Sequence, residues 1–300
     1  MSTLAATNLK HASSASNNIV LDSSGNATFA GTAVPASSFL RNRIINGAMD
    51  IAQRGTSGTT GYLVDRWTAL NTSAQSQSSD APTGFLNSLE FTSSSATFPF
   101  VSQRIERINS YDLASRTVTF SLWAKNVSGA STLYVEIYRA NTNDNFSAVT
   151  LEGTVVLSAS PSASWTLYSG SIALSASATT GIELRIIRNN AAAASTRITG
   201  VQLEVGTAAT PFERRQYGQE LALCQRYYEI FGYTMKAGAN YYIPYSYKAT
   251  KRTSPTLALV AGTLSSGTIA GTAYNPEQAM RQVNASTVDA DAQISASAEL

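Results

Sequence analysis

The chain has 300 residues, of which 13% are charged and 43% hydrophobic, and its formal net charge is +2. A typical soluble domain has about 25% charged residues, so Ser and Thr replace charged side chains on much of the expected surface. The chain has no basic half for binding phosphates, and no apolar run approaches the roughly 18 residues of a membrane span. We therefore expect a soluble chain of roughly two domains, without a signal peptide, nucleic-acid partner or membrane insertion.

The chain has one cysteine, Cys224, and one histidine, His11. An intrachain disulfide needs two cysteines, and structural zinc needs about four Cys or His ligands. His11 stands in a Ser/Ala-rich stretch with little to pack against, which argues against a Ser-His-Asp or Cys-His catalytic arrangement. The sequence thus predicts no metal, no cofactor and no histidine-based catalysis.

Residues 1–40 are low in complexity, with one exception. A short apolar run at 19–21, a turn cluster at 22–26 and a β-prone run at 27–29 predict a small hairpin. Because a two-stranded hairpin alone is marginally stable in water, it needs another chain or a larger body to pack on. We expect an attachment or trimerisation segment; the alternative is a tail ordered only by its contacts.

Residues 41–216 alternate between apolar and polar side chains with the period of two that β-strands have. Three triplets are expected on core faces: Val118, Phe120 and Leu122; Leu133, Val135 and Ile137; Ile182, Leu184 and Ile186. The intervening Tyr134, Glu136, Tyr138, Glu183 and Arg185 are expected to face outward. Short strands separated by Ser/Gly/Asn turns predict an all-β fold, an antiparallel β-sandwich of jelly-roll type.

The parity of the alternation changes at Gly200. Ile198 precedes the glycine, while Val201, Leu203 and Val205 follow with the opposite parity. A glycine at such a switch predicts a β-bulge that re-aims the later side chains.

Residues 217–231 break the β pattern. Leu221, Cys224 and Tyr228 recur at helical spacing and Gly232 follows, which predicts a helix of about four turns with Cys224 as a buried, structural thiol. Strands are expected again at 241–247, 256–260 and 293–300. We expect 217–300 to be a second, smaller β-rich domain introduced by this helix.

Five segments carry a resemblance to a known family: 42–55, 62–67, 198–206, 209–215 and 220–228. They include Asn46-Gly47-Ala48-Met49-Asp50, Asp65-Arg66-Trp67, Gly200-Val201-Gln202-Leu203-Glu204, Pro211-Phe212-Glu213-Arg214 and Gln225-Arg226-Tyr227-Tyr228. Their order and spacing resemble a family of bacteriophage tail-fibre and tail proteins. The resemblance implies a carbohydrate-binding-module-like jelly roll on a virion fibre, in a homotrimer joined to the particle through the amino terminus. It implies no catalytic residues.

The motif residues also have a physical interpretation of their own. Asp65, Arg66 and Trp67 combine a charge pair with an indole, whose ring needs packing and whose N–H needs an acceptor. Pro211 stops a strand ladder, and Phe212 can then close the edge of the sandwich. We interpret both as structural joints rather than ligand-binding sites.

Tyrosines are the leading candidates for binding, because they combine a flat apolar ring with a polar tip. Nine of the 14 tyrosines lie in residues 217–300. Four of these are expected to line a receptor surface: Tyr241, Tyr242, Tyr245 and Tyr247. The alternative is that they pack against the helix and a trimer axis.

Aromatic residues of the sandwich offer a second candidate surface. Trp165, Tyr134 and Tyr138, with Tyr168, could form a sugar-stacking face, although subunit contacts would explain them equally well.

Two other chemistries are weaker candidates. The Asn-rich run at 141–145 has oxygen ligands of the kind calcium uses, but it supplies one carboxylate, Asp144, and such runs are ordinary turn formers. A carboxylate pair such as Glu90 and Glu106 would suit a polysaccharide-cleaving enzyme. No repeat of 20–50 residues, as in solenoid spikes, supports that alternative.

The sequence as a whole predicts a non-catalytic virion tail-fibre protein, made in the host cytoplasm, that attaches to a host-surface glycan. The alternative is a structural adaptor or decoration protein that holds neighbouring tail or capsid subunits. The expected partners are further copies of the chain in a homotrimer, tail or baseplate proteins at the amino terminus, and the glycan.

Overall fold

The computed structural model describes residues 7–10, 12–13, 17, 19–21, 27–29, 41–93, 98–129, 131–189, 193–235, 241–262, 270–283 and 290–300. The chain forms two compact units, Met1–Arg41 and Asn42–Leu300. His11 and the turn expected at 22–26 lie outside the described residues.

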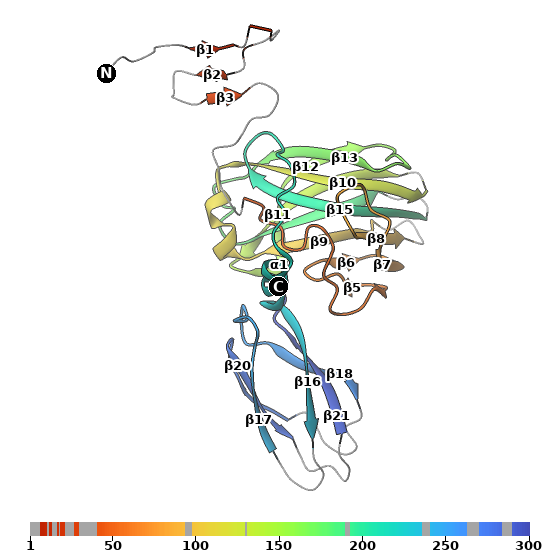
Figure 1. The fold of residues 1–300 in the computed structure, drawn as a ribbon, viewed down its shortest axis with the longest axis vertical. Coiled ribbons are helices and arrows are strands. Elements are labelled where there is room, and N and C mark those ends of the chain that lie inside the picture. The colour runs from red at the N-terminus through yellow and green to blue at the C-terminus, as the bar shows by residue number, and fades with distance from the viewer. Residues whose placement is uncertain are drawn as a thin grey trace, which may run out of the picture. The chain divides into compact units, whose positions relative to one another are not determined.

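The first unit contains a small antiparallel sheet (Figure 1). Strand β2 (Ile19–Leu21) pairs with β3 (Ala27–Phe29), with Ile19 opposite Phe29, which confirms the predicted hairpin. A third strand, β1 (Asn8–Leu9), pairs with the other edge of β2. The third strand supplies hydrogen-bond partners that a hairpin alone lacks.

Residues 42–216 form an antiparallel sandwich of two six-stranded sheets, which confirms the predicted fold class. The first sheet runs β13 (Thr166–Ala173), β10 (Thr117–Ser128), β15 (Ala194–Val205), β8 (Ser88–Ser93), β7 (Ala74–Ser78), β4 (Ser57–Gly58). The second runs β12 (Asn145–Ser158), β11 (Thr132–Thr142), β14 (Ile182–Asn189), β9 (Phe100–Ile105), β6 (Thr68–Leu70), β5 (Gly61–Tyr62). The chain crosses repeatedly between the sheets, from β8 to β9 and back to β10, as in a jelly roll.

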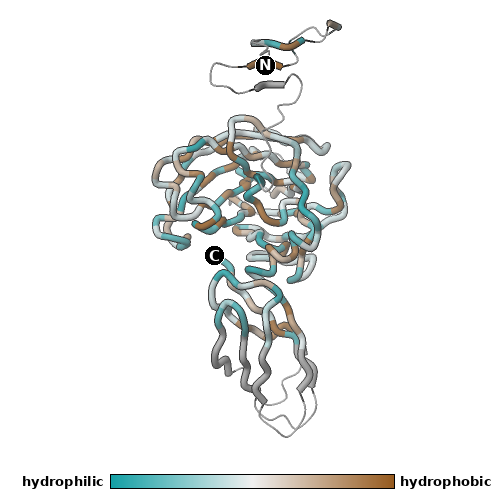
Figure 2. Tube along the Cα trace, turned by 60° about the vertical axis from the view of Figure 1, so that its left-hand side comes forward, coloured by the Kyte–Doolittle hydropathy of each residue, from teal (hydrophilic) through white to brown (hydrophobic). Residues whose placement is uncertain are grey.

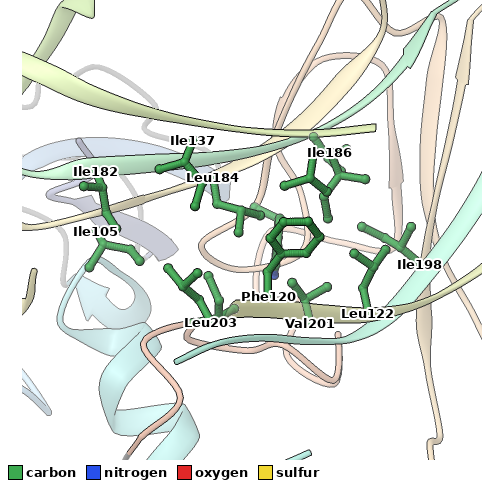
Figure 3. Close-up of a cluster of buried hydrophobic side chains, with 14 of the residues drawn as sticks. Ile105, Phe120, Leu122, Ile137, Ile182, Leu184, Ile186, Ile198, Val201 and Leu203 are labelled. Carbon is green, nitrogen blue, oxygen red and sulfur yellow. The ribbon is translucent and has the colours of Figure 1, made fainter. Parts of the chain in front are cut away.

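The hydrophobic core fills the space between these sheets. All the residues of the three predicted core triplets have 0% exposure: Val118, Phe120, Leu122, Leu133, Val135, Ile137, Ile182, Leu184 and Ile186. Figure 3 shows Phe120 pointing from β10 toward Leu184 and Ile186 of β14. Figure 2 shows hydrophobic and hydrophilic residues interspersed along the sandwich, as expected for sheets with one buried face.

One outward-facing residue departs from this pattern. Glu183 lies on the outer face of β14 as the alternation predicts, but its exposure is 0%, so the expectation that it meets solvent is wrong. The side chains of Arg104 and Arg185 pair with the carboxylate and shield it from water.

A β-bulge interrupts the pairing of β10 with β15 at Gly200, as the change of parity predicts. Ser121 pairs with Gln202, but Trp123 pairs with Thr199, so β15 contains one residue more. Gly200 has a φ of +61°, in the left-handed region that favours glycine.

The C-terminal part begins with a helix shorter than predicted. Helix α1 spans Tyr217–Gln225, and Tyr228 already begins strand β16 (Tyr228–Met235). The expectation of a helix to residue 231 is therefore wrong. The residues after Tyr227 include aromatic and β-branched side chains, which favour a strand. The backbone of Tyr228 pairs with that of Ser297. Cys224 is fully buried, as predicted.

Two three-stranded sheets follow the helix (Figure 1). One has the order β16-β21-β18 and the other β17-β20-β19. The new strands are β17 (Tyr241–Ser246), β18 (Thr256–Gly262), β19 (Ala270–Tyr274), β20 (Gln278–Val283) and β21 (Ala290–Ser297). Strands are thus present at all three predicted places, 241–247, 256–260 and 293–300, and their ends differ from the expected bounds by at most three residues.

Substitution of Gly200 by alanine tests the bulge. A Cβ at this position would meet Cζ of Phe85 at 2.6 Å and Cδ1 of Trp123 at 3.0 Å, in addition to the backbone strain of a positive φ. We expect a loss of about 1–3 kcal/mol in the free energy of unfolding, measured by chemical denaturation. Gly61→Ala is the control, because Gly61 also has a positive φ but a Cβ there meets nothing within 4 Å. Equal stability of G200A and wild type would contradict the bulge geometry.

Candidate functional site

The outer face of the second sheet brings together side chains from three neighbouring strands. In β11, β14 and β9 the outward residues align in three rows: Tyr134, Ile187 and Phe100; Glu136, Arg185 and Ser102; Tyr138, Glu183 and Arg104. Because alternate residues of a strand share a face, each row is a set of direct neighbours. Aromatic rings and charged groups are therefore adjacent on one surface.

We define the aromatic platform as Phe100, Tyr134, Glu136, Tyr138 and Arg185, all half-buried. The guanidinium carbon of Arg185 lies 4.1 Å from the ring centre of Tyr138 and 4.9 Å from that of Phe100. A cation over a ring face is attracted by the ring quadrupole, so Arg185 holds the two rings on either side of it. The platform thus has a fixed arrangement of rings around one cation.

The buried carboxylate of Glu183, a neighbour on the same face of β14, also holds Arg185 in place. Its Oε2 lies 2.6 Å from Nη2 of Arg185, and its Oε1 accepts a hydrogen bond of 2.7 Å from Oγ of Ser102. Nε of Arg104 lies 3.5 Å from the same Oε1. A buried charge is tolerated when it is paired and hydrogen-bonded in this way. Glu183 therefore restricts the rotamers of both arginines.

The polar tip of Tyr138 is also held in place. Its hydroxyl donates a 2.6 Å hydrogen bond to Oε2 of Glu136, whose Oε1 accepts one from Thr154 at 3.1 Å. Burial, together with the neighbouring Glu136 carboxylate, raises the pKa of Tyr138 to about 12. The phenol consequently remains a neutral hydrogen-bond donor at any physiological pH.

Trp165 does not join Tyr134 and Tyr138 on this face, although the sequence grouped them. It precedes β13 of the first sheet, where its Nε1 donates a 3.0 Å hydrogen bond to Oδ1 of Asp80. Asp80 also pairs with Lys125 at 2.7 Å and with Arg197. Hydrogen bonds from Lys125 and Trp165 lower the pKa of Asp80 to about 2. Tyr168 also lies on β13 of the first sheet, where it packs against the core. Of the four aromatic residues grouped from the sequence, the outer face of the second sheet therefore holds Tyr134 and Tyr138 alone.

The tyrosines expected at a receptor surface lie in the C-terminal part, and two of their side chains are described. Tyr247 is only 8% exposed and packs with Phe231 and Ile294 in a small core, so a receptor-facing ring is excluded there. Tyr245 stacks on Phe231 with ring centres 3.8 Å apart. Both rings contact Phe231, within the segment 217–231 that the packing alternative named, although this residue belongs to β16 and not to a helix.

The backbones of Tyr241 and Tyr242 belong to β17, while their side chains lie outside the described residues.

The motif Asp65-Arg66-Trp67 contacts the C-terminal part. Arg66 is 1% exposed, pairs with the carboxylate of Glu299 and lies 3.4 Å from the ring centre of Tyr227. Arg54 lies 3.5 Å from the ring centre of Tyr228 and 3.0 Å from the carboxylate of Glu299. We call Arg54, Arg66, Tyr227, Tyr228 and Glu299 the arginine–tyrosine junction.

The rest of the motif anchors this junction in the sandwich. Trp67 is fully buried and donates from Nε1 to the carbonyl of Asn46 at 3.1 Å. Asp65 accepts from the amide of Gln53 at 2.9 Å. Phe212, which follows Pro211, packs edge-on against Phe85 with ring centres 5.2 Å apart.

The weaker sequence candidates have structural partners. Asp144 lies in the tight turn between β11 and β12, and its Oδ1 accepts a 2.6 Å hydrogen bond from the backbone amide of Arg107. Glu90, in β8 of the first sheet, pairs with Arg197 at 2.8 Å. Glu106, which follows β9 of the second sheet, pairs with Arg226 at 2.9 Å. Across the described residues, no three His, Cys, Asp or Glu side chains gather as metal ligands. In the same residues, no helix has the length and apolar character needed to cross a bilayer.

Comparisons with known proteins give structural neighbours only. No family model matches the chain, and no curated protein matches its sequence. Solved structures of β-sandwich modules do align with it. The CBM22-1 xylan-binding domain of Paenibacillus barcinonensis Xyn10C is 14% identical, with a TM-score of 0.38 over 58% of this chain and 100% of that one.

Two further neighbours are similar at the same level. The C-terminal family 22 carbohydrate binding module of Clostridium thermocellum Xyn10B is 14% identical, with a TM-score of 0.38 over 54% of this chain and all of that one. The enzymatically active domain of bacteriophage CBA120 tailspike protein 4 is 12% identical, with a TM-score of 0.36 over 55% of this chain and 22% of that one. At TM-scores below 0.5, these neighbours carry no functional argument for the chain.

The stability of the motif is expected to depend on pH through Asp65. Burial raises the pKa of Asp65 from 3.8 to about 6, against the hydrogen bonds from Gln53. The folded state then binds the proton more tightly than the unfolded state, so stability falls as the pH rises from about 4 to about 6 and the loss is complete above that range. The loss is up to about 3 kcal/mol at roughly 1.4 kcal/mol per pKa unit.

Denaturant unfolding of wild type and Asp65→Asn between pH 4 and 7.5 measures this dependence. The substitution should flatten the slope between pH 4 and 6. Asp80→Asn is the matched control, because a pKa near 2 places its titration below that window. An unchanged slope in D65N would contradict the assignment.

Proposed function

We propose that this chain is a bacteriophage virion tail-fibre protein that attaches to a host-surface glycan through the aromatic platform, without cleaving it. The order and spacing of the segments between residues 42 and 228 support the virion assignment by resemblance. The platform supports the binding assignment. As a virion fibre it would act as a homotrimer joined to tail or baseplate proteins through residues 1–40.

The observation that carries the proposal is the fixed placement of Arg185 between the rings of Tyr138 and Phe100. A pyranose has an apolar face of C–H groups that stacks on an aromatic ring, and a rim of hydroxyls that needs hydrogen-bonding groups. The platform offers ring edges and faces beside a carboxylate, a guanidinium and a phenol. Because Glu183 and Glu136 already restrict Arg185 and Tyr138, binding orders few side chains and loses little entropy.

The same contacts support binding without chemistry. Hydrolysis of a glycosidic bond uses two carboxyl groups, one of them with a raised pKa as the acid. The carboxylates at the platform are Glu136 and Glu183, and both are engaged with neighbouring donors. Such groups orient a ligand and the side chains that contact it.

The structural-adaptor alternative is favoured by a different observation. Large apolar side chains are exposed on the edge strands of both sheets: Val156 at 62% and Leu151 at 47% on β12, and Leu167 at 54% on β13. Exposed apolar residues at sheet edges suit contacts with another protein. If Val156→Lys and Leu167→Lys abolish a multimer seen by light scattering, and wild type binds no glycan, this alternative is preferred.

The platform is tested with purified bacterial lipopolysaccharides and capsular polysaccharides, immobilised for interferometry. Wild type should bind at least one of them, and Tyr138→Ala and Arg185→Ala should each weaken binding by about tenfold or more, or about 1.4 kcal/mol. Tyr111→Ala is the matched control, since Tyr111 is 56% exposed and lies outside the platform. The proposal fails if both folded variants bind as wild type does. New reducing or unsaturated ends on the polysaccharide would exclude the non-catalytic assignment.

A further inference from the structure

A cavity of about 340 Å³ opens elsewhere on the sandwich, among the segments 42–51, 86–87 and 212–220. Small-molecule sites typically measure roughly 300–1,000 Å³ and combine apolar walls with a few polar groups. None of its lining residues belongs to the aromatic platform. The cavity is therefore a separate feature that the proposed function does not use.

The mouth of the cavity has apolar walls that face solvent. Leu86 is 75% exposed and Tyr217 is 64% exposed, and Phe212 also contributes to the lining. Single exposed apolar residues are ordinary, but two of this size beside one cavity offer a surface on which an apolar ring face can rest.

Two polar side chains of the cavity, Asp50 and Arg214, lie near each other without a direct hydrogen bond. Oδ1 of Asp50 accepts a 3.0 Å hydrogen bond from Nδ2 of Asn87, which orients the carboxylate. Oδ2 of Asp50 lies 3.8 Å from Nη1 of Arg214, longer than a hydrogen bond. The gap suits one oxygen atom that donates to Asp50 and accepts from Arg214. A hydroxyl group does both, whereas a carboxylate cannot donate and an ammonium cannot accept.

Arg214 is positioned for this role by its other contacts. Its Nη2 donates to the carbonyl of Gly84, and its guanidinium lies 4.9 Å from the ring centre of Phe85 and 5.7 Å from that of Phe212. These contacts restrict a long side chain that is otherwise half exposed. The group is thus held in place before any ligand arrives.

Close contacts hold the lining of the cavity between residues 42–51 and 212–220. Arg215 donates to the carbonyl of Ile44 at 2.9 Å and pairs with Glu220 at 3.2 Å. Gly47 packs so closely that a Cβ there would lie 2.1 Å from the carbonyl oxygen of Val201. The backbone of the loop is therefore anchored to strand β15 and to helix α1.

We propose that this cavity is a second saccharide-binding site, which takes a neutral pyranose. One ring hydroxyl bridges Asp50 and Arg214, while the apolar face of the sugar rests on Tyr217 and Leu86. The lining pairs Asp50 with Arg214 and Glu220 with Arg215, so it has no net charge to attract an acidic sugar. The site is independent of the platform, so a chain with both would bind a glycan at two points and gain affinity by the linkage between them.

The test is an amide NMR titration of the full chain with methyl α-glucopyranoside, methyl α-mannopyranoside and methyl β-galactopyranoside, each to about 50 mM, which detects dissociation constants in the millimolar range. At least one neutral glycoside should shift the amides of Gly47, Asn87 and Tyr217 in a saturable manner. Glucuronate at the same concentration should bind at least about tenfold more weakly.

Variants separate this site from the platform. Tyr217→Ala and Asp50→Ala should each weaken binding by about tenfold, while Tyr111→Ala and the platform variant Tyr138→Ala leave it unchanged. Tyr217 is exposed, so its truncation does not endanger folding. The proposal is overturned if no neutral glycoside shifts the cavity amides, if the shifts lie only on the platform, or if glucuronate binds best.

Discussion

Two arginines, the buried Arg66 and the half-buried Arg54, pack against tyrosines and connect the sandwich to the C-terminal part. Arg66 is almost completely buried, and the carboxylate of Glu299, the carbonyl of Arg104 and the ring of Tyr227 compensate its guanidinium for lost hydration. Arg54 repeats the arrangement with Tyr228. Tyr227 and Tyr228 come shortly after helix α1, so the helix has to end at Gln225 for the two rings to reach the arginines. The same constraint sets the start of β16 and brings the strand of residues 290–297 beside it.

Polar contacts on the surface of the sandwich have a related role. The ion pair of Glu183 with Arg185, and the hydrogen bond from Asn87 to Asp50, hold polar groups in position next to rings or apolar side chains. Only 13% of the residues are charged, and on these surfaces the charged side chains lie in defined pairs. The platform and the cavity are thus rigid surfaces presented by strands and a short loop, and a ligand meets groups that are already oriented.

Much of the fold could be predicted from the sequence, because it depends on local patterns. Period-two alternation identified the core triplets, and the parity switch located the bulge at Gly200. The helix end could not be predicted, since Tyr228 fits the helical stripe of Leu221 and Cys224, and its pairing with Ser297 in a strand is a tertiary contact. The site was predicted in part. Alternation places Tyr134, Tyr138 and Arg185 outward, but it does not reveal that β9 lies beside β14, which brings Phe100 to the platform and leaves Trp165 on the other sheet.

The central claim is that a glycan meets the outer face of β11, β14 and β9 rather than the tyrosines of the C-terminal part. Ring-labelled tyrosine NMR of the full chain, titrated with a polysaccharide that it binds, tests this claim most directly. The account predicts shifts of the Tyr134 and Tyr138 ring signals, with those of Tyr245 and Tyr247 unchanged because these rings pack on Phe231 in a small core. Shifts at Tyr245 or Tyr247 with none at Tyr134 and Tyr138 would contradict it.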